Sequence, residues 1–199
     1  MKRTTLLPWL LSSTLFIFSF SPALAAPLAD GSTAFDLNVA PGSIIQFEHL
    51  TIEEGLSRPT DLALSPSGRV VYVVDAARCR IQAFDREGKL LQTFGSRGDG
   101  PTDFVRPFGI AVDADANVYV SDEPGHKIVK FDAGGRPVAA FGREGLGRVE
   151  FFKPKGLAFD ARGRLVVVDW GNHRGQVLTV AGEFVRSFGA RLFIQPTLK

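Results

Sequence analysis

The sequence has few of the residues that carry disulfide, metal or redox chemistry. Its 199 residues include one cysteine, Cys79, and three histidines. A single cysteine excludes an internal disulfide framework, so stability must come from packing. The sequence contains no G-x-S-x-G motif, and its Gly98-Asp-Gly and Gly145-Leu-Gly segments do not stand between a strand and a helix. These absences leave no signature of a serine hydrolase or of a nucleotide-binding fold.

Long apolar runs are also scarce, and only one, at about residues 6–20, approaches the length of a membrane span. Two basic residues precede this run, and Ala23-Leu24-Ala25 follows it. A basic start, a short apolar core and a small-residue motif predict a secretory signal peptide at residues 1–26. We therefore expect a secreted or periplasmic protein with no membrane span after cleavage.

Residues 27–199 have no excess of positive or negative charge. Lys2 and Arg3 carry the whole formal charge of +2, because the other 21 basic residues equal the 21 acidic ones. A neutral chain lacks the basic surface that nucleic acids select, so we expect no nucleic-acid partner. Residues 27–199 have the length of a single domain.

What the sequence does contain is one pattern repeated three times at a spacing of 47 residues. Each copy has an Asp, a basic residue five positions later, and a Phe-Gly pair. These markers are Asp75, Asp122 and Asp169; Arg80, Lys127 and Arg174; and Phe94-Gly95, Phe141-Gly142 and Phe188-Gly189. A fixed period of 40–50 residues is typical of propellers and related arrays.

Each copy contains four short segments rich in β-branched and aromatic residues, separated by turns with Gly, Pro, Asn or Asp. Such segments are typical of antiparallel strands, and four of them per period form one propeller blade. The sequence therefore predicts an all-β fold, a partial β-propeller with about three full blades within residues 56–199. The blades are expected at residues 59–95, 107–142 and 154–189.

Both ends of residues 27–199 resemble parts of the repeat. In the N-terminal segment 27–55, residues 43–47 resemble a fourth strand that closes a blade from outside, and residues 193–199 resemble the start of another blade. Three full blades do not close a ring, and an arc leaves strand edges unpaired. Three explanations stay open: a truncated form of a longer propeller, a homodimer that completes the ring, and a stable open arc.

The second copy resembles an NHL repeat, in Pro107–Asp113, Asn117–Asp122 and Lys127–Phe131. The third copy carries the Asn172-His173 pair of that family, whereas the first has Arg78-Cys79 there. The resemblance covers residues 56–189. It implies a propeller of about six blades that serves as a binding platform, with enzymes as a minority of related propellers.

Six basic residues are expected on one face of the blades, where the loop that leads into each blade and the hairpin between its second and third strands lie. Three precede the first strand and three open the third strand: Arg58, Arg106 and Lys153, and Arg80, Lys127 and Arg174. Converging Lys and Arg bind phosphates, acidic glycans or carboxylate-bearing partners. For the second set, the alternative is a structural ion pair with the repeated Asp of the same hairpin.

Two further features fall on the hairpins. Trp170 follows the third repeated Asp, where an exposed ring would stack on a sugar or clamp a peptide, or would instead pack beneath a neighbouring loop. Cys79, His126 and His173 occupy equivalent positions, and one Cys with two His is a set that can bind zinc. The resemblance implies zinc-binding His residues in related amidating lyases, but also His at this position without a catalytic role. Calcium on the propeller axis is a further alternative that no residue pattern supports.

The expected function is that of an exported, non-catalytic binding or scaffolding module, with a protein, peptide or glycan ligand on the loop face. We predict no catalytic residue and no cofactor. The alternatives are a metal-dependent enzyme of the lyase or lactonase type and a truncated remnant of a longer propeller.

Overall fold

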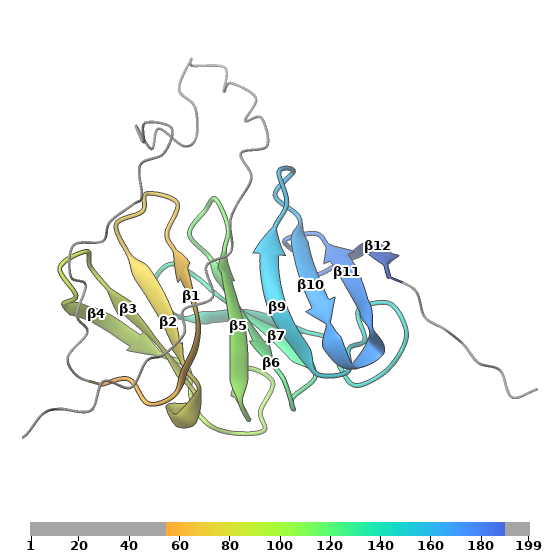
Figure 1. Cartoon of the computed structure of the whole chain (residues 1–199), viewed down its shortest axis with the longest axis horizontal. Helices are drawn as coiled ribbons and strands as arrows, with labels where there is room; N and C mark the ends of the chain where they lie inside the picture. The colour runs from red at the N-terminus through yellow and green to blue at the C-terminus, as the bar shows by residue number, and fades with distance from the viewer. Residues whose placement is uncertain (1–54, 190–199) are drawn as a thin grey trace, which may run out of the picture. The chain divides into compact units, whose positions relative to one another are not determined.

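The computed structural model describes residues 55–189, which form three four-stranded antiparallel sheets (Figure 1). The first sheet contains β1 (Pro59–Leu64), β2 (Val71–Asp75), β3 (Arg80–Phe84) and β4 (Leu90–Phe94). The second contains β5 (Pro107–Val112), β6 (Val118–Asp122), β7 (Lys127–Phe131) and β8 (Pro137–Phe141). The third contains β9 (Pro154–Phe159), β10 (Leu165–Asp169), β11 (Arg174–Leu178) and β12 (Phe184–Phe188). The predicted fold, a partial β-propeller of four-stranded blades, is confirmed.

Several predicted features lie outside the described residues. They are the signal peptide at 1–26, the N-terminal segment with its strand at 43–47, and the start of another blade at 193–199. Within residues 55–189, the structure has no helix that is long and apolar enough to cross a membrane. The helices it does have are two single 3₁₀ turns that the sequence did not predict, η1 (Ala76–Arg78) and η2 (Trp170–Asn172).

The repeat spacing sets the register of the hairpin between the second and third strands of each blade. Each repeated Asp lies directly opposite the basic residue five positions later. The residue before that basic residue takes a left-handed conformation, with φ of 53° at Cys79 and 54° at both His126 and His173. His tolerates this conformation better than most residues. A backbone requirement therefore accounts for the two histidines at equivalent positions, but not for the cysteine.

Neighbouring blades pack face to face, and the alternation of side chains along each strand gives a blade two apolar faces. Phe94 of the first blade lies 5.1 Å from Phe131 of the second, between ring centroids. Tyr119 of the second blade lies 5.1 Å from Phe159 of the third. The innermost strands β1, β5 and β9 stand side by side, as Figure 1 shows. These contacts form two buried clusters, one at each junction between blades.

Gly109 permits the close approach of two inner strands. A Cβ atom at this position would lie 2.0 Å from the carbonyl oxygen of Lys155, well inside van der Waals contact. The backbone of β9 therefore fills the space that any other residue at position 109 would need. The same junction is held by Ser121, whose hydroxyl donates a hydrogen bond to the Lys155 carbonyl oxygen at 2.6 Å.

The repeated Asp connects the second strand of each blade to the loop that leads into that blade, called here the lead-in loop. The carboxylate of Asp122 is fully buried and accepts hydrogen bonds from the backbone N–H groups of Val105 and Arg106, at 3.0 and 2.8 Å. Asp75 accepts one from Ser57 at 2.8 Å, and Asp169 accepts one from Phe152 at 2.7 Å. In each blade the Asp thus satisfies backbone donors that would otherwise lack a partner.

Replacing Asp122 by Ala should destabilise the protein by about 2–4 kcal/mol, because two backbone donors of the lead-in loop lose their buried acceptor. Urea denaturation followed by circular dichroism measures this loss. Asp115→Ala is the matched control, since Asp115 is exposed and should cost within about 0.5 kcal/mol. Equal losses in the two variants would contradict this role of the buried carboxylate.

Asp160, in the turn between β9 and β10, should make stability depend on acid pH. Arg164 donates its side-chain Nε–H to Asp160 at 2.7 Å, and this bond, with backbone N–H donors, lowers the pKa of Asp160 from 3.8 to about 2. A carboxyl group with a lowered pKa stabilises the fold above its unfolded pKa. That contribution is present above about pH 4 and is lost as the pH falls towards 2.

A carboxyl-carbon NMR titration checks this value directly. In the Arg164→Gln variant, the pKa of Asp160 should move back towards 3.8, because the side-chain hydrogen bond that lowers it most is removed. Arg136→Gln is the control, since Arg136 pairs with Asp132 in a different turn. An Asp160 pKa that is the same in both variants would contradict the assignment.

Candidate functional site

Two of the three basic residues that open a third strand are used inside their own blades. Arg80 Nε lies 3.0 Å from Asp75 Oδ2, and Arg174 Nε lies 2.8 Å from Asp169 Oδ2. Arg174 also donates to the carbonyl oxygens of Leu146, Gly147 and Glu150, at 2.7–2.9 Å. Both arginines therefore tie a hairpin to a neighbouring loop, as the structural interpretation of the repeat predicted.

Lys127 departs from that interpretation. It stands opposite Asp122, but its ammonium donates to the carbonyl oxygen of Gly100 at 2.6 Å, and the described residues show no ion pair between the two. The expected ion pair is wrong for this hairpin. Lysine lacks the planar fork by which Arg80 and Arg174 reach an Asp and a carbonyl oxygen together.

The three basic residues before the first strands are more accessible. Arg58 and Arg106 are exposed, and Lys153 is half-buried. Arg106 donates to Glu123 at 2.8 Å, while the ammonium of Lys153 lies 5.5 Å from the centre of the Phe152 ring. Arg58 and Lys153 both have positive φ, of 64° and 55°. These side chains lie on the loop face, as expected, but they do not share one partner.

Trp170 belongs to a group of aromatic and charged side chains that the sequence analysis did not identify. The ammonium of Lys155 lies 3.9 Å from the centre of the Trp170 ring and 5.1 Å from that of Phe108. It also lies 3.8 Å from Glu123, the partner of Arg106. We call these five residues, Arg106, Phe108, Glu123, Lys155 and Trp170, the Trp170 rim.

The Trp170 rim is built from equivalent positions of two neighbouring blades. Phe108 and Lys155 are the second residues of β5 and β9, and Glu123 and Trp170 directly follow the repeated Asp. Aligning the repeats shows that these positions are equivalent, but it did not predict a site there. The residue types differ from blade to blade, and the first blade has Thr60 and Ala76 at these positions.

The chemistry of the Trp170 rim suits an anionic ligand with a flat apolar surface. Two cations face one carboxylate, and Glu123 is nearly buried while Arg106 keeps close to half of its side chain exposed. Trp170 is 50% exposed, so its ring is open to a second stacking partner. Arg and Lys bind carboxylates through charge-assisted hydrogen bonds, and an exposed indole ring adds apolar contact.

The alternative zinc set is not brought together. In residues 55–189, no three or more His, Cys, Asp or Glu side chains are placed to hold one metal ion. Cys79 is buried and donates to the carbonyl oxygen of Val105 at 3.3 Å, and burial raises the pKa of its thiol. His126 accepts a hydrogen bond from the backbone of Lys153 at 3.2 Å and stacks on Phe152, whereas His173 is exposed.

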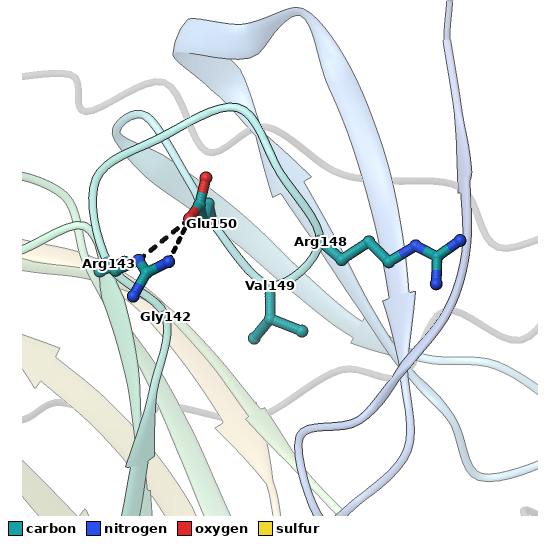
Figure 2. Close-up of a pocket in the computed structure, with 5 residues that line it drawn as sticks. All are labelled: Gly142, Arg143, Arg148, Val149 and Glu150. Atoms are coloured by element: carbon teal, nitrogen blue, oxygen red, sulfur yellow. Dashed lines mark hydrogen bonds and ion pairs between the residues drawn. The ribbon is translucent and has the colours of Figure 1, made fainter.

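A hollow of about 320 Å³ lies in the loop between β8 and β9, lined by Gly142, Arg143, Arg148, Val149 and Glu150 (Figure 2). Figure 2 shows Arg143 and Glu150 turned towards each other, and Arg148 extending away from this pair. The Arg143 guanidinium lies 2.7 Å from Glu150 and lowers the pKa of that carboxyl group. The hollow has the same charge balance as the Trp170 rim, two cations and one carboxylate, but its lining residues include no aromatic ring. It is therefore a weaker candidate for an anion with a flat apolar surface.

The sequence was also compared with those of known proteins. Residues 63–141 match a protein family described as a 6-bladed β-propeller. A comparison with curated protein sequences gave no match.

Solved structures of similar fold include several propellers. Hydrazine synthase from Kuenenia stuttgartiensis shares 19% identity at a TM-score of 0.55, over 75% of this chain and 40% of that one. A catalytically inactive virginiamycin B lyase from Staphylococcus aureus shares 15% identity at a TM-score of 0.55, over 70% of this chain and 44% of that one. A chain of a nidogen/laminin complex shares 29% identity at a TM-score of 0.52, over 67% of this chain and 48% of that one.

This chain therefore spans less than half the length of each of these three structures. At 19% and 15% identity, the similarity to hydrazine synthase and to the lyase shows a shared fold alone. Together with the three four-stranded sheets, the comparisons identify the described residues as part of a β-propeller.

Proposed function

We propose that this chain is an exported propeller module of the NHL type that binds a carboxylate-bearing macromolecule without catalysis. The observation that carries the proposal is the Lys155 ammonium 3.9 Å above the half-exposed Trp170 ring, next to Arg106. The ligand is an acidic glycan or an acidic peptide. Its carboxylate meets Arg106 and Lys155, and its flat or apolar part lies on Trp170.

The arrangement of the Trp170 rim favours binding over structural use of these side chains. Arg80 and Arg174 are occupied by several internal acceptors, whereas the described partner of Arg106 is Glu123 alone. Glu123 also holds Lys155, so that both cations are positioned before a ligand arrives. Positioning of this kind reduces the entropy that binding costs.

Relatives of the fold support a macromolecular partner. One structure of similar fold is a chain in a nidogen/laminin complex. The lyase or lactonase alternative requires a metal held by side chains from several blades, and the described residues place no such set together. The proposal of a binding role therefore rests on the Trp170 rim.

Calorimetric titration of the purified protein tests the proposal, with polygalacturonate, polyglutamate and neutral dextran as probes. We expect binding to one or both acidic polymers and none to dextran. Trp170→Ala and Lys155→Gln should each weaken binding by about tenfold, since loss of one such contact corresponds to about 1.4 kcal/mol. The preferred polymer distinguishes a glycan from a peptide ligand.

Lys89→Gln is the matched control. Lys89 is exposed in the turn after β3, at the opposite end of its blade from the lead-in loops, and its loss changes the net charge by the same amount. It should leave affinity unchanged. An equal loss in Lys89→Gln and Lys155→Gln would mean diffuse charge attraction and would refute the Trp170 rim. Failure of both acidic polymers to bind would refute the ligand class.

A further inference from the structure

The two junctions between the three blades repeat one interface. In both, side chains from the second, third and fourth strands of one blade pack on the strands of the next blade. We call the first of these surfaces the following face, since it meets the following blade, and the other the preceding face. The exposed fractions of equivalent residues in different blades can therefore be compared.

Among residues 55–189, no element covers the following face of the third blade. Phe188 is 47% exposed, whereas the equivalent Phe94 in the first blade is 8% exposed. Val168 is 46% exposed, whereas the equivalent Val74 and Ser121 are fully buried. Phe188 and Val168 are the same as, or more apolar than, their equivalents in the other two blades. The difference in exposure therefore comes from the neighbouring blade that covers the following faces of the first and second blades. The third blade presents an interface of the same pattern without its partner.

Gly156 supports this interpretation independently of exposure. It occupies on β9 the place that Gly109 occupies on β5, where the missing side chain admits the backbone of the next inner strand. At Gly156, a Cβ atom would approach only the side chain of Val168, at 3.3 Å. No described backbone uses this space. The third blade therefore keeps the room for a further inner strand.

A surface that fits this face exists on the first blade of the same chain. Leu62 of β1 is 55% exposed, whereas its equivalent on β5, Ile110, is 3% exposed because it packs on the first blade. Leu64 is 43% exposed. The outer part of this preceding face is buried: Val71, Val73 and Phe84 form a cluster against which Leu56 packs. The accessible part is thus the inner strand, the element that forms the core of both internal junctions.

We propose that a second copy of this chain covers the third blade, with its Leu62 and Leu64 packed on Val168, Gly156 and Phe188. The first copy does the same for the second, so that two junctions form around a two-fold axis. Two sets of the three blades formed by residues 55–189 give six, the number in the description of the family that residues 63–141 match. The proposal goes beyond the ligand-binding function, and each new junction continues the interface already formed twice within the chain.

Light scattering of the purified full chain after size-exclusion chromatography tests the proposal. We expect twice the mass of one chain at micromolar concentration. Val168→Lys and Leu62→Lys should each give a single chain, because each places an ammonium in both junctions. Val138→Lys is the control, since Val138 is 59% exposed on the outer strand of the second blade and should leave the dimer intact. Circular dichroism of each variant checks that it is folded.

Mixing the two disruptive variants gives a result that misfolding cannot imitate. In a mixed pair, one junction carries both lysines and the other is wild type, so native mass spectrometry should detect the mixed dimer and neither variant's own dimer. A wild-type protein that is a monomer or an open-ended oligomer would overturn the proposal. So would a dimer that survives Val168→Lys and Leu62→Lys.

Discussion

The buried carboxylate at the end of each second strand is the interaction on which the loop face depends. Asp75, Asp122 and Asp169 each accept backbone N–H groups of the lead-in loop, and two of them also hold the arginine opposite. The lead-in loop and the hairpin are thereby fixed at one end of the blade. The residue after each Asp and the second residue of each inner strand then face a common region. The Trp170 rim occupies these positions in the second and third blades.

The 47-residue period was enough to predict the strands, the blades and the hairpin register, because these depend on features that recur in every copy. It also predicted the ion pairs of Arg80 and Arg174, which follow from that register. It failed for Lys127, because the ammonium donates instead to the loop carbonyl oxygen of Gly100, a contact that the side-chain spacing does not reveal. It missed Phe108, Glu123 and Lys155 because a ligand site built on a repeat lies where the copies differ.

Exposure was the other property that the sequence could not supply. Phe94 and Phe188 are the same residue at the same place in the pattern, yet one is buried and the other is half exposed. The difference depends on which blade has a neighbour, a property of the assembly rather than of local sequence. Glycine carries part of this information: Gly109 is explained by the strand beside it, and Gly156 stands at the same place without one.

The central claim, that the Asp-anchored loop face forms a ligand site around Trp170, is tested most directly by NMR. A titration of the labelled protein with oligomers of galacturonate and of glutamate should, for at least one of them, shift the indole N–H of Trp170 and the backbone amides next to Arg106 and Lys155, saturably and with one dissociation constant. Shifts confined to other parts of the surface, or saturable binding that leaves the Trp170 indole unchanged, would contradict it.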